Sequence, residues 1–243
     1  MSKKILGIIP ARYSSTRFPG KPLADINGKP MIQHVYERAL KAKSLYKVLI
    51  ATDDEKIFNA AKNFNADVVM TDSNLPNGTA RCEQAAKKFN ENIDAVINIQ
   101  GDEPLLDPLM IDEVAELLKD SCCATLCSEL KEDFENPNIV KVVMSQDNRA
   151  LYFSRSLIPY ERNKNENIKF FQHIGIYGYD FEFLKKYVNL TPTPLSETES
   201  LEQLKILEHG YKIKIKVTDS KIKSLGVDTP EDLEKVREII KNA

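Results

Sequence analysis

The sequence has few of the residues that build metal centres and disulfide frameworks. Its 243 residues include four cysteines and three histidines. The cysteines, Cys82, Cys122, Cys123 and Cys127, form no Cys-x-x-Cys pair, so we expect neither a zinc site nor a set of disulfides. Buried, reduced thiols are expected instead, as in a protein of the cytosol.

Long hydrophobic runs and an excess of basic charge are also missing. No apolar run approaches the roughly 20 residues that span a bilayer. Lys3-Lys4 is followed by only a short apolar stretch, so we expect no membrane helix and no signal peptide. The net charge is −2 and the isoelectric point is about 6.0. A general nucleic-acid binder usually has an isoelectric point above about 9, so we expect no nucleic-acid partner.

Short apolar runs alternate with segments of helical periodicity along most of the chain. Runs typical of strands cover 5–9, 48–51, 95–99, 139–143, 174–177 and 213–217. Helical spacing recurs at 31–40, 57–64, 109–118 and 233–240. This alternation predicts a single α/β domain over residues 1–243 with a mostly parallel central sheet. From about 136 to 195, strand-like runs follow one another with little helix, which predicts an antiparallel insertion or subdomain.

Three helix starts are predicted from capping residues. Asp53 is placed to cap the helix that begins near Asp54, and Ser196 with Glu199 has the spacing of a capping box. Thr229 followed by Pro230 and two acids is typical of a helix start.

A basic, hydroxyl-rich loop follows the first predicted strand. In open parallel sheets, ligands bind beyond the carboxyl ends of the strands, where this loop begins. Residues 1–50 contain ten Lys and Arg against two Asp and Glu. The loop holds three of these cations with several hydroxyls and a glycine: Arg12, Arg17, Lys21, Ser14, Ser15, Thr16 and Gly20. Such donors suit several phosphate oxygens at once. Neither a Walker A motif nor Gly-x-Gly-x-x-Gly is present, so a merely solvated loop stays an alternative.

Two aspartates follow other predicted strands. Asp102 lies in Gln100-Gly-Asp-Glu-Pro104, directly after 95–99, and Asp228 lies between Leu225-Gly-Val227 and the last helix. If these strand ends are neighbours, both carboxylates face one crevice with the basic loop. Mg²⁺ prefers one or two carboxylates together with substrate phosphates and water. Each aspartate could instead have a local role, as a cap or as the residue before one.

Other candidates have ordinary structural alternatives. The turn at Asn77-Gly-Thr-Ala-Arg81 could present donors to a base or a phosphate, or could be a plain turn. His173 could be a satisfied strand histidine, and Arg155 could clamp a carboxylate or pair with an acid. Glu202 and Gln203 could form an exposed helix face.

Taken together, these segments resemble the 3-deoxy-manno-octulosonate cytidylyltransferase family, whose members are also called CMP-Kdo synthetases. The resemblance is carried by residues 9–25 and 28–31, and then in order by Gln100-Gly-Asp-Glu-Pro104, Phe153-Ser-Arg155, Gln172-His-Ile-Gly-Ile-Tyr-Gly178, Leu201-Glu-Gln-Leu204 and Gly226-Val-Asp-Thr-Pro-Glu-Asp232. The ordered set spans essentially the whole chain. It is much more specific than the first loop, which other sugar nucleotidyltransferases share loosely.

The resemblance implies a Rossmann-like nucleotidyltransferase fold and a defined reaction. CMP would pass from CTP to the anomeric hydroxyl of 3-deoxy-D-manno-octulosonate (Kdo), with Mg²⁺ as cofactor and pyrophosphate as second product. The product would serve lipopolysaccharide or capsule synthesis in the cytoplasm. The enzyme would be a homodimer, with 136–195 binding the sugar and the partner subunit.

The same resemblance implies a role for each matching residue. The nucleotide would be bound by Pro10, Ala11, Arg12, Ser14, Lys21, Asn77, Gly78, Thr79 and Arg81. The sugar acid would contact Gln100, Arg155, His173, Tyr177, Glu202 and Gln203. Asp102 and Asp228 would bind Mg²⁺, and they would be catalytic together with Lys21 and Arg12. Ala80 stands where the family commonly has an acid, and Tyr160 stands where tryptophan is frequent, so the roles of these two positions stay open.

Two rival functions remain compatible with the residues. Another cytidylyltransferase would use a sialic acid or an amino-substituted Kdo as its acceptor. A non-catalytic nucleotide-binding module would bind CTP without releasing pyrophosphate, although the retention of Lys21, Asp102 and Asp228 argues against it.

Overall fold

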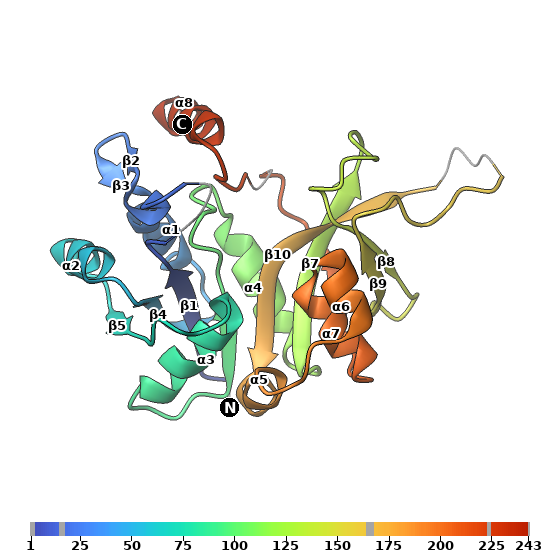
Figure 1. Cartoon of the computed structure of the whole chain (residues 1–243), viewed down its shortest axis with the longest axis horizontal. Coiled ribbons are helices and arrows are strands. Elements are labelled where there is room, and N and C mark those ends of the chain that lie inside the picture. The colour runs from blue at the N-terminus through green and yellow to red at the C-terminus, as the bar shows by residue number, and fades with distance from the viewer. Residues whose placement is uncertain (1–2, 15–17, 164–167, 223–224, 243) are drawn as a thin grey trace.

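One mixed sheet with helices on both faces organises the chain (Figure 1). The computed structural model describes residues 3–14, 18–163, 168–222 and 225–242. The strands of the main sheet are β1 (Ile5–Ala11), β4 (Leu45–Thr52), β5 (Val68–Met70), β6 (Ala95–Asn98), β7 (Cys123–Leu130), β8 (Lys141–Met144), β9 (Ala150–Ser154), β10 (Phe170–Asp180) and β11 (Lys214–Val217). A separate small hairpin joins β2 (Asp25–Ile26) to β3 (Lys29–Pro30).

The helices are α1 (Met31–Ala39), α2 (Glu55–Asn63), α3 (Gly78–Lys88), α4 (Pro108–Leu117), α5 (Phe181–Tyr187), α6 (Pro194–Glu199), α7 (Glu202–Glu208) and α8 (Pro230–Lys241), with a short 3-10 helix at Lys21–Leu23. Helices and strands alternate from α1 to β7, as the periodicity predicts, whereas four strands and then three helices follow one another between β7 and α7. Among the described residues, none of these helices has the length and apolar character that crossing a bilayer needs.

The strand order of the main sheet is β11-β7-β10-β6-β1-β4-β5. β1 pairs in parallel with both β4 and β6, and β4 pairs in parallel with β5. The carboxyl ends of β1 and β6 therefore meet at one edge, and the basic loop and the Asp102 loop both begin there. The predicted α/β class with a mostly parallel sheet is confirmed.

The antiparallel part of the sheet is confirmed too, but it begins earlier than predicted. β10 runs antiparallel to β6 on one side and to β7 on the other, while β8 and β9 form an antiparallel pair beside it. β7 was not predicted, because its Cys123-Ala-Thr-Leu-Cys127 core lacks the β-branched run that marks the other strands. The subdomain boundaries at 136 and 195 stay a prediction.

Two of the three predicted helix starts need correction. The cap of α2 is Asp54, whose side chain accepts from the backbone of Lys56 and Ile57, because Asp53 is paired with Arg81. The capping box of α6 is formed by Thr193 and Ser196, so Ser196 lies inside the first turn and does not cap a helix. Pro194 explains the shift, since proline favours the first helical position. The predicted cap at Thr229 is confirmed, and its box is closed by Asp232.

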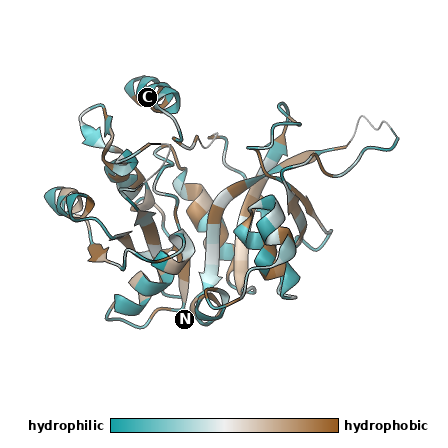
Figure 2. Ribbon diagram, in the orientation of Figure 1, coloured by the Kyte–Doolittle hydropathy of each residue, from teal (hydrophilic) through white to brown (hydrophobic). Residues whose placement is uncertain are grey.

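Hydrophobic residues recur along the strands, whereas the helices mix hydrophobic and hydrophilic residues (Figure 2). One core cluster packs α1, α2 and α4 against one face of the sheet. A second packs α3, α5 and α7 against the other face. β10 approaches α4 so closely that a Cβ atom at Gly178 would lie 2.5 Å from a methyl carbon of Val114, so only glycine fits there. The site residues are thus carried by strands with both faces covered.

Candidate active site

Two adjoining cavities lie at the carboxyl ends of β1 and β6. The first, here called the loop cavity, has a volume of about 430 Å³ and is lined by Pro10, Ala11, Arg12, Ser14, Lys21, Pro22, Asn77, Gly78, Gln100, Gly101 and Asp102. The second, here called the inner cavity, has a volume of about 280 Å³ and is lined by Gly78, Thr79, Asn98, Gln100, Tyr177, Tyr179, Tyr187, Ser200, Leu201, Glu202 and Gln203. Gly78 and Gln100 border both cavities. The arrangement can hold two ligands, or two parts of one, next to each other.

Lys21 lies between the two aspartates that the sequence singles out. Its ammonium donates to Asp102 Oδ2 at 2.7 Å and lies 3.4 Å from Asp228 Oδ1. The lysine comes from the 3-10 helix that ends the basic loop, and Asp102 comes from the loop after β6. Gly101 allows that loop to approach β1, because a Cβ there would lie 2.8 Å from the Pro10 carbonyl oxygen. The structure therefore brings together three groups that are far apart in sequence.

Asp228 is positioned from both sides of its chain segment. The Val227 amide donates to the Asp102 carbonyl at 2.9 Å, which ties the two aspartate segments together. On the other side, Thr229 caps α8, and the side chain of Asp232 accepts from the backbone amides of Asp228 and Thr229. Asp228 is thus the residue before a helix cap, which was the local role considered from the sequence. It also lies close to Lys21 and, through it, to Asp102.

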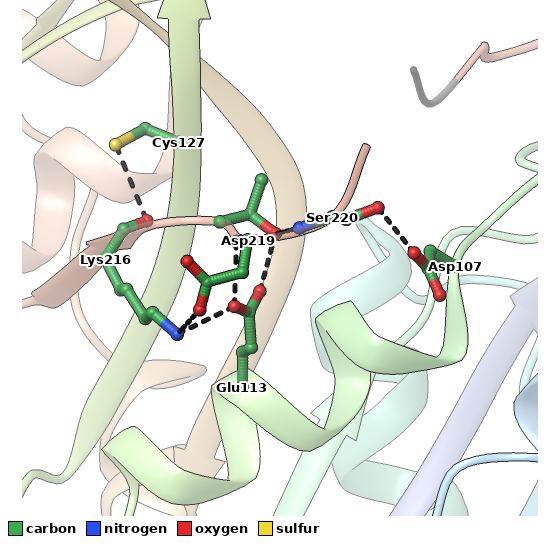
Figure 3. Close-up of polar contacts among 7 residues, drawn as sticks. Asp107, Glu113, Cys127, Lys216, Asp219 and Ser220 are labelled. Atoms are coloured by element: carbon green, nitrogen blue, oxygen red, sulfur yellow. Dashed lines mark hydrogen bonds and ion pairs between the residues drawn. The ribbon is translucent and has the colours of Figure 1, made fainter. Parts of the chain in front are cut away.

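A buried glutamate anchors the chain upstream of Asp228 (Figure 3). Glu113 of α4 is 5% exposed and accepts from Lys216 at 2.7 Å, from the Thr218 hydroxyl and from the Asp219 amide at 2.9 Å. Ser220 donates to Asp107, the cap of α4. These contacts hold the end of β11 and the residues after it against α4, on the path that leads to Asp228.

The other predicted nucleotide-binding residues divide into two groups. Arg12 borders the loop cavity while its guanidinium donates to the Leu75 carbonyl. Asn77 caps α3 by accepting from the Ala80 amide at 2.8 Å, which places Gly78 and Thr79 in the first helical turn beside the inner cavity. Arg81 borders neither cavity, because its fully buried guanidinium pairs with Asp53 at 2.8 Å. Burial lowers the pKa of Arg81, and the Asp53 carboxylate opposes that effect. Arg17, Ser15 and Thr16 lie outside the described residues.

The predicted sugar-binding residues also divide. Gln100, Tyr177, Glu202 and Gln203 line the inner cavity. The amide of Gln100 donates to the Gly175 carbonyl at 2.9 Å, which fixes its orientation. Desolvation raises the pKa of Glu202, and its carboxylate accepts from Thr79 at 3.5 Å. Arg155 lines neither cavity, and its guanidinium donates to the carbonyls of Glu199, Ser200 and Pro137.

His173 also lies outside both cavities. Its Nε2 atom is 3.1 Å from the Thr125 hydroxyl, and its ring packs on Phe153 and Tyr177. Burial lowers the pKa of His173 from its ordinary value of 6.5 to about 3, so the ring is uncharged at neutral pH. These contacts are those of a strand histidine whose hydrogen bonding is satisfied within the protein, the alternative considered from the sequence. A contact between His173 and the sugar acid stays a prediction.

The depressed pKa of His173 makes a testable contribution to acid sensitivity. Between pH 6.5 and 3 the unfolded histidine binds a proton that the folded one refuses, so the free energy of unfolding falls as the pH drops through this window. When the pH is lowered from 7 to 5, the free energy of unfolding of the wild type is expected to fall by about 2 kcal/mol more than that of His173→Gln. Denaturant titrations at both pH values measure this difference. The matched control is His209→Gln at an exposed ring, and equal pH dependence of wild type and His173→Gln would contradict the assignment.

Sequence reasoning missed Asn98. It is the last residue of β6, it is 4% exposed, and it lines the inner cavity together with Tyr177 and Gln100. A signal was present, because Asn98 is the only polar residue in the apolar run Ala95-Val-Ile-Asn-Ile99. Strands buried on both faces are normally apolar throughout, so a polar residue within one marks a special position.

The carboxylates of Asp102 and Asp228 fit a shared magnesium ion. Both already converge on one cationic point, the Lys21 ammonium. Within the described ranges no group of three or more His, Cys, Asp or Glu side chains could hold a metal. The site therefore offers one or two carboxylates and leaves the other positions to phosphate and water, which is the pattern Mg²⁺ prefers. The cysteines offer no alternative, since all four are free thiols and burial raises the pKa of Cys127 to about 12.

Residues 6–215 match the family model described as cytidylyltransferase. A curated relative, 3-deoxy-manno-octulosonate cytidylyltransferase of Fusobacterium nucleatum, is 51% identical over 98% of this chain and 97% of its own. The chain belongs to this cytidylyltransferase family. The mitochondrial 3-deoxy-manno-octulosonate cytidylyltransferase of Arabidopsis thaliana is 47% identical over 98% of the chain and 83% of its own length. The resemblance stated from the motifs is thereby confirmed.

A solved structure supports the same placement within the cytidylyltransferases. It is CMP:2-keto-3-deoxy-manno-octonic acid synthetase complexed with CTP, with a TM-score of 0.93 and 40% identity over 98% of this chain and 99% of that one. The predicted nucleotidyltransferase fold is confirmed by this match.

Proposed function

We propose that this cytidylyltransferase transfers CMP from CTP to the anomeric hydroxyl of Kdo and releases pyrophosphate. The observation that carries the proposal is the convergence of Asp102 and Asp228 on Lys21, which lines the loop cavity with Asp102. Full-length similarity to proteins named 3-deoxy-manno-octulosonate cytidylyltransferase, and to a synthetase complexed with CTP, supports both substrates.

The charges of the two cavities support a division of labour. Arg12 and Lys21 line the loop cavity, where guanidinium and ammonium groups can neutralise the phosphates of CTP. No lysine or arginine is among the residues that line the inner cavity in the described structure, and amides, phenols and one carboxylate line it instead. The acceptor sugar would occupy the inner cavity, with its reacting hydroxyl near Gln100, which borders both.

The reaction then needs positioning and charge stabilisation and no protein nucleophile. The acceptor oxygen forms a bond to the α-phosphorus of CTP, the bond to the leaving pyrophosphate breaks, and the hydroxyl proton is released. Lys21 and Arg12 would stabilise the charge that moves onto the pyrophosphate. A magnesium ion held by Asp102 and Asp228 would neutralise phosphate charge and lower the pKa of the acceptor hydroxyl.

Assembly, location and pathway complete the proposal. We infer a homodimer formed through the 136–195 segment, because the described residues of that segment expose three large apolar side chains, Leu151 at 60%, Tyr160 at 88% and Leu195 at 43%. The four free thiols favour the reducing cytoplasm. CMP-Kdo made there would serve lipopolysaccharide or capsule synthesis.

A panel of acceptors tests the proposed activity against its rivals. Pyrophosphate release is measured with CTP, Mg²⁺ and each of Kdo, an amino-substituted Kdo and a sialic acid. We expect the highest kcat/KM with Kdo, by at least about tenfold, because a site that hydrogen-bonds substrate hydroxyls discriminates strongly against analogues. A preference for either other acceptor would overturn the substrate assignment. CTP binding without pyrophosphate release from any acceptor would favour the non-catalytic module.

A further inference from the structure

Asn98 shares one face of the sheet with a residue already assigned to the sugar. It lies directly opposite Tyr177 on the antiparallel neighbour β10. Directly opposed residues of paired strands project from the same face with their Cβ atoms about 5 Å apart. Both residues line the inner cavity, together with the first turn of α3 and the start of α7. The carboxamide and the phenol are therefore presented to the same ligand.

One oxygen atom on each side chain of this pair is buried without a hydrogen-bond partner of normal geometry in the described structure. Asn98 is 4% exposed and Tyr177 is 9% exposed. Neither Asn98 Oδ1 nor the Tyr177 hydroxyl makes a hydrogen bond of normal geometry within the described part of the chain, although Thr125 neighbours the tyrosine. Buried polar atoms are almost always hydrogen-bonded, so each exception needs an explanation. A ligand bound in the inner cavity that hydrogen-bonds to both oxygen atoms would explain both exceptions.

The chemistry around Asn98 identifies the kind of ligand group. Its companions in the cavity wall include Gln100, Gln203 and Tyr177, all uncharged, and no lysine or arginine that would suit a phosphate is among the described lining residues. The cations that suit phosphates line the neighbouring loop cavity. An uncharged hydroxyl group is the partner that a carboxamide oxygen accepts from in such surroundings.

Resting on the proposed function, we propose that the carboxamide oxygen of Asn98 accepts a hydrogen bond from a hydroxyl group of the acceptor sugar. Together with Tyr177 it forms a neutral polar floor that selects a polyhydroxylated acceptor. Asn98 is thus a specificity-determining residue on the rigid end of β6, four residues before the Asp102 carboxylate that the reaction uses.

Steady-state kinetics of Asn98→Leu test this assignment. The KM for Kdo is expected to rise by about tenfold or more, whereas the KM for CTP stays within about twofold, because only the acceptor loses a buried hydrogen bond. The thermal midpoint is expected to stay equal or to rise, since the carboxamide oxygen has no protein partner to lose. A purely structural role would instead lower the midpoint and leave the ratio of the two KM values unchanged.

Matched variants separate the possible failures. Ile97→Val changes the neighbouring residue of β6, whose side chain packs in the opposite core cluster, and it should leave both KM values unchanged. Asn98→Ala removes the carboxamide without adding bulk, and it should reproduce the effect if leucine does not fit. An unchanged KM for Kdo in a folded Asn98 variant, or an equal rise in the KM for CTP, would overturn the role of Asn98 and leave the proposed function intact. A wild-type protein that releases no pyrophosphate with Kdo would overturn the proposed function, and the inference with it.

Discussion

Asp102→Asn is expected to lower kcat for pyrophosphate release by about 10³-fold while the protein stays folded. The carboxylate would hold the magnesium ion that the phosphates require, and the neutral amide is a much poorer ligand for a hard cation. Folding should survive, because the Asp102 side chain is 35% exposed and its ion pair with Lys21 contributes at most about 1 kcal/mol. The measurement is kcat with saturating CTP, Kdo and Mg²⁺, beside a thermal melt.

The matched control is an aspartate at the other end of the same strand. Asp94 precedes β6 and accepts from the Lys4 amide at 2.7 Å, at the edge of the sheet away from the two cavities. Asp94→Asn should change kcat by less than about twofold. Near-wild-type turnover in folded Asp102→Asn would remove the basis for the metal assignment.

Lys21→Met is expected to lower kcat/KM for CTP by about 10²-fold. The substitution removes the cation that faces the leaving phosphates, and it leaves the Asp102 and Asp228 carboxylates without the charge that they share in this structure. Methionine keeps most of the length of the side chain, so a packing defect is a minor cause. Competition binding of CTP and initial rates over a range of CTP concentration separate lost affinity from lost turnover.

Lys29→Met provides the comparison for Lys21. Lys29 comes from the same N-terminal region, but it pairs with Glu37 at 2.8 Å on the exposed surface. Its removal should leave kcat/KM for CTP within about twofold, since exposed ion pairs contribute little. Similar losses in both lysine variants would mean that general surface charge, and not the placement of Lys21, promotes CTP use.

The central sheet and the aspartate cluster were accessible from the sequence because their signals are local. β1 and β6 are short apolar runs that end at conspicuous polar loops, and parallel strand ends meet at one edge. That rule places Lys21 near Asp102, and the pairing at 2.7 Å agrees with it. The cap at Thr229 is equally local, because side chain, proline and acid all lie within one turn.

The rest depends on contacts between distant residues, which no local pattern encodes. Arg81 follows a turn that suits a nucleotide, yet Asp53 from another loop engages its guanidinium inside the protein. The ion pair with Arg81 also explains why Asp53 does not cap α2. Asn98 is a candidate site residue because it lies opposite Tyr177 on the antiparallel strand β10. The apolar run around Asn98 does not indicate which distant strand pairs with it.

Product analysis of the wild-type protein is the most direct test of CMP transfer from CTP to Kdo. CTP and Kdo are incubated with Mg²⁺, and the nucleotide products are identified by mass spectrometry while pyrophosphate is quantified. We expect CMP-Kdo and pyrophosphate in equal amounts, with neither formed when Kdo or Mg²⁺ is omitted. Intact CTP in the complete mixture, or pyrophosphate released without a CMP-sugar product, would contradict this transfer.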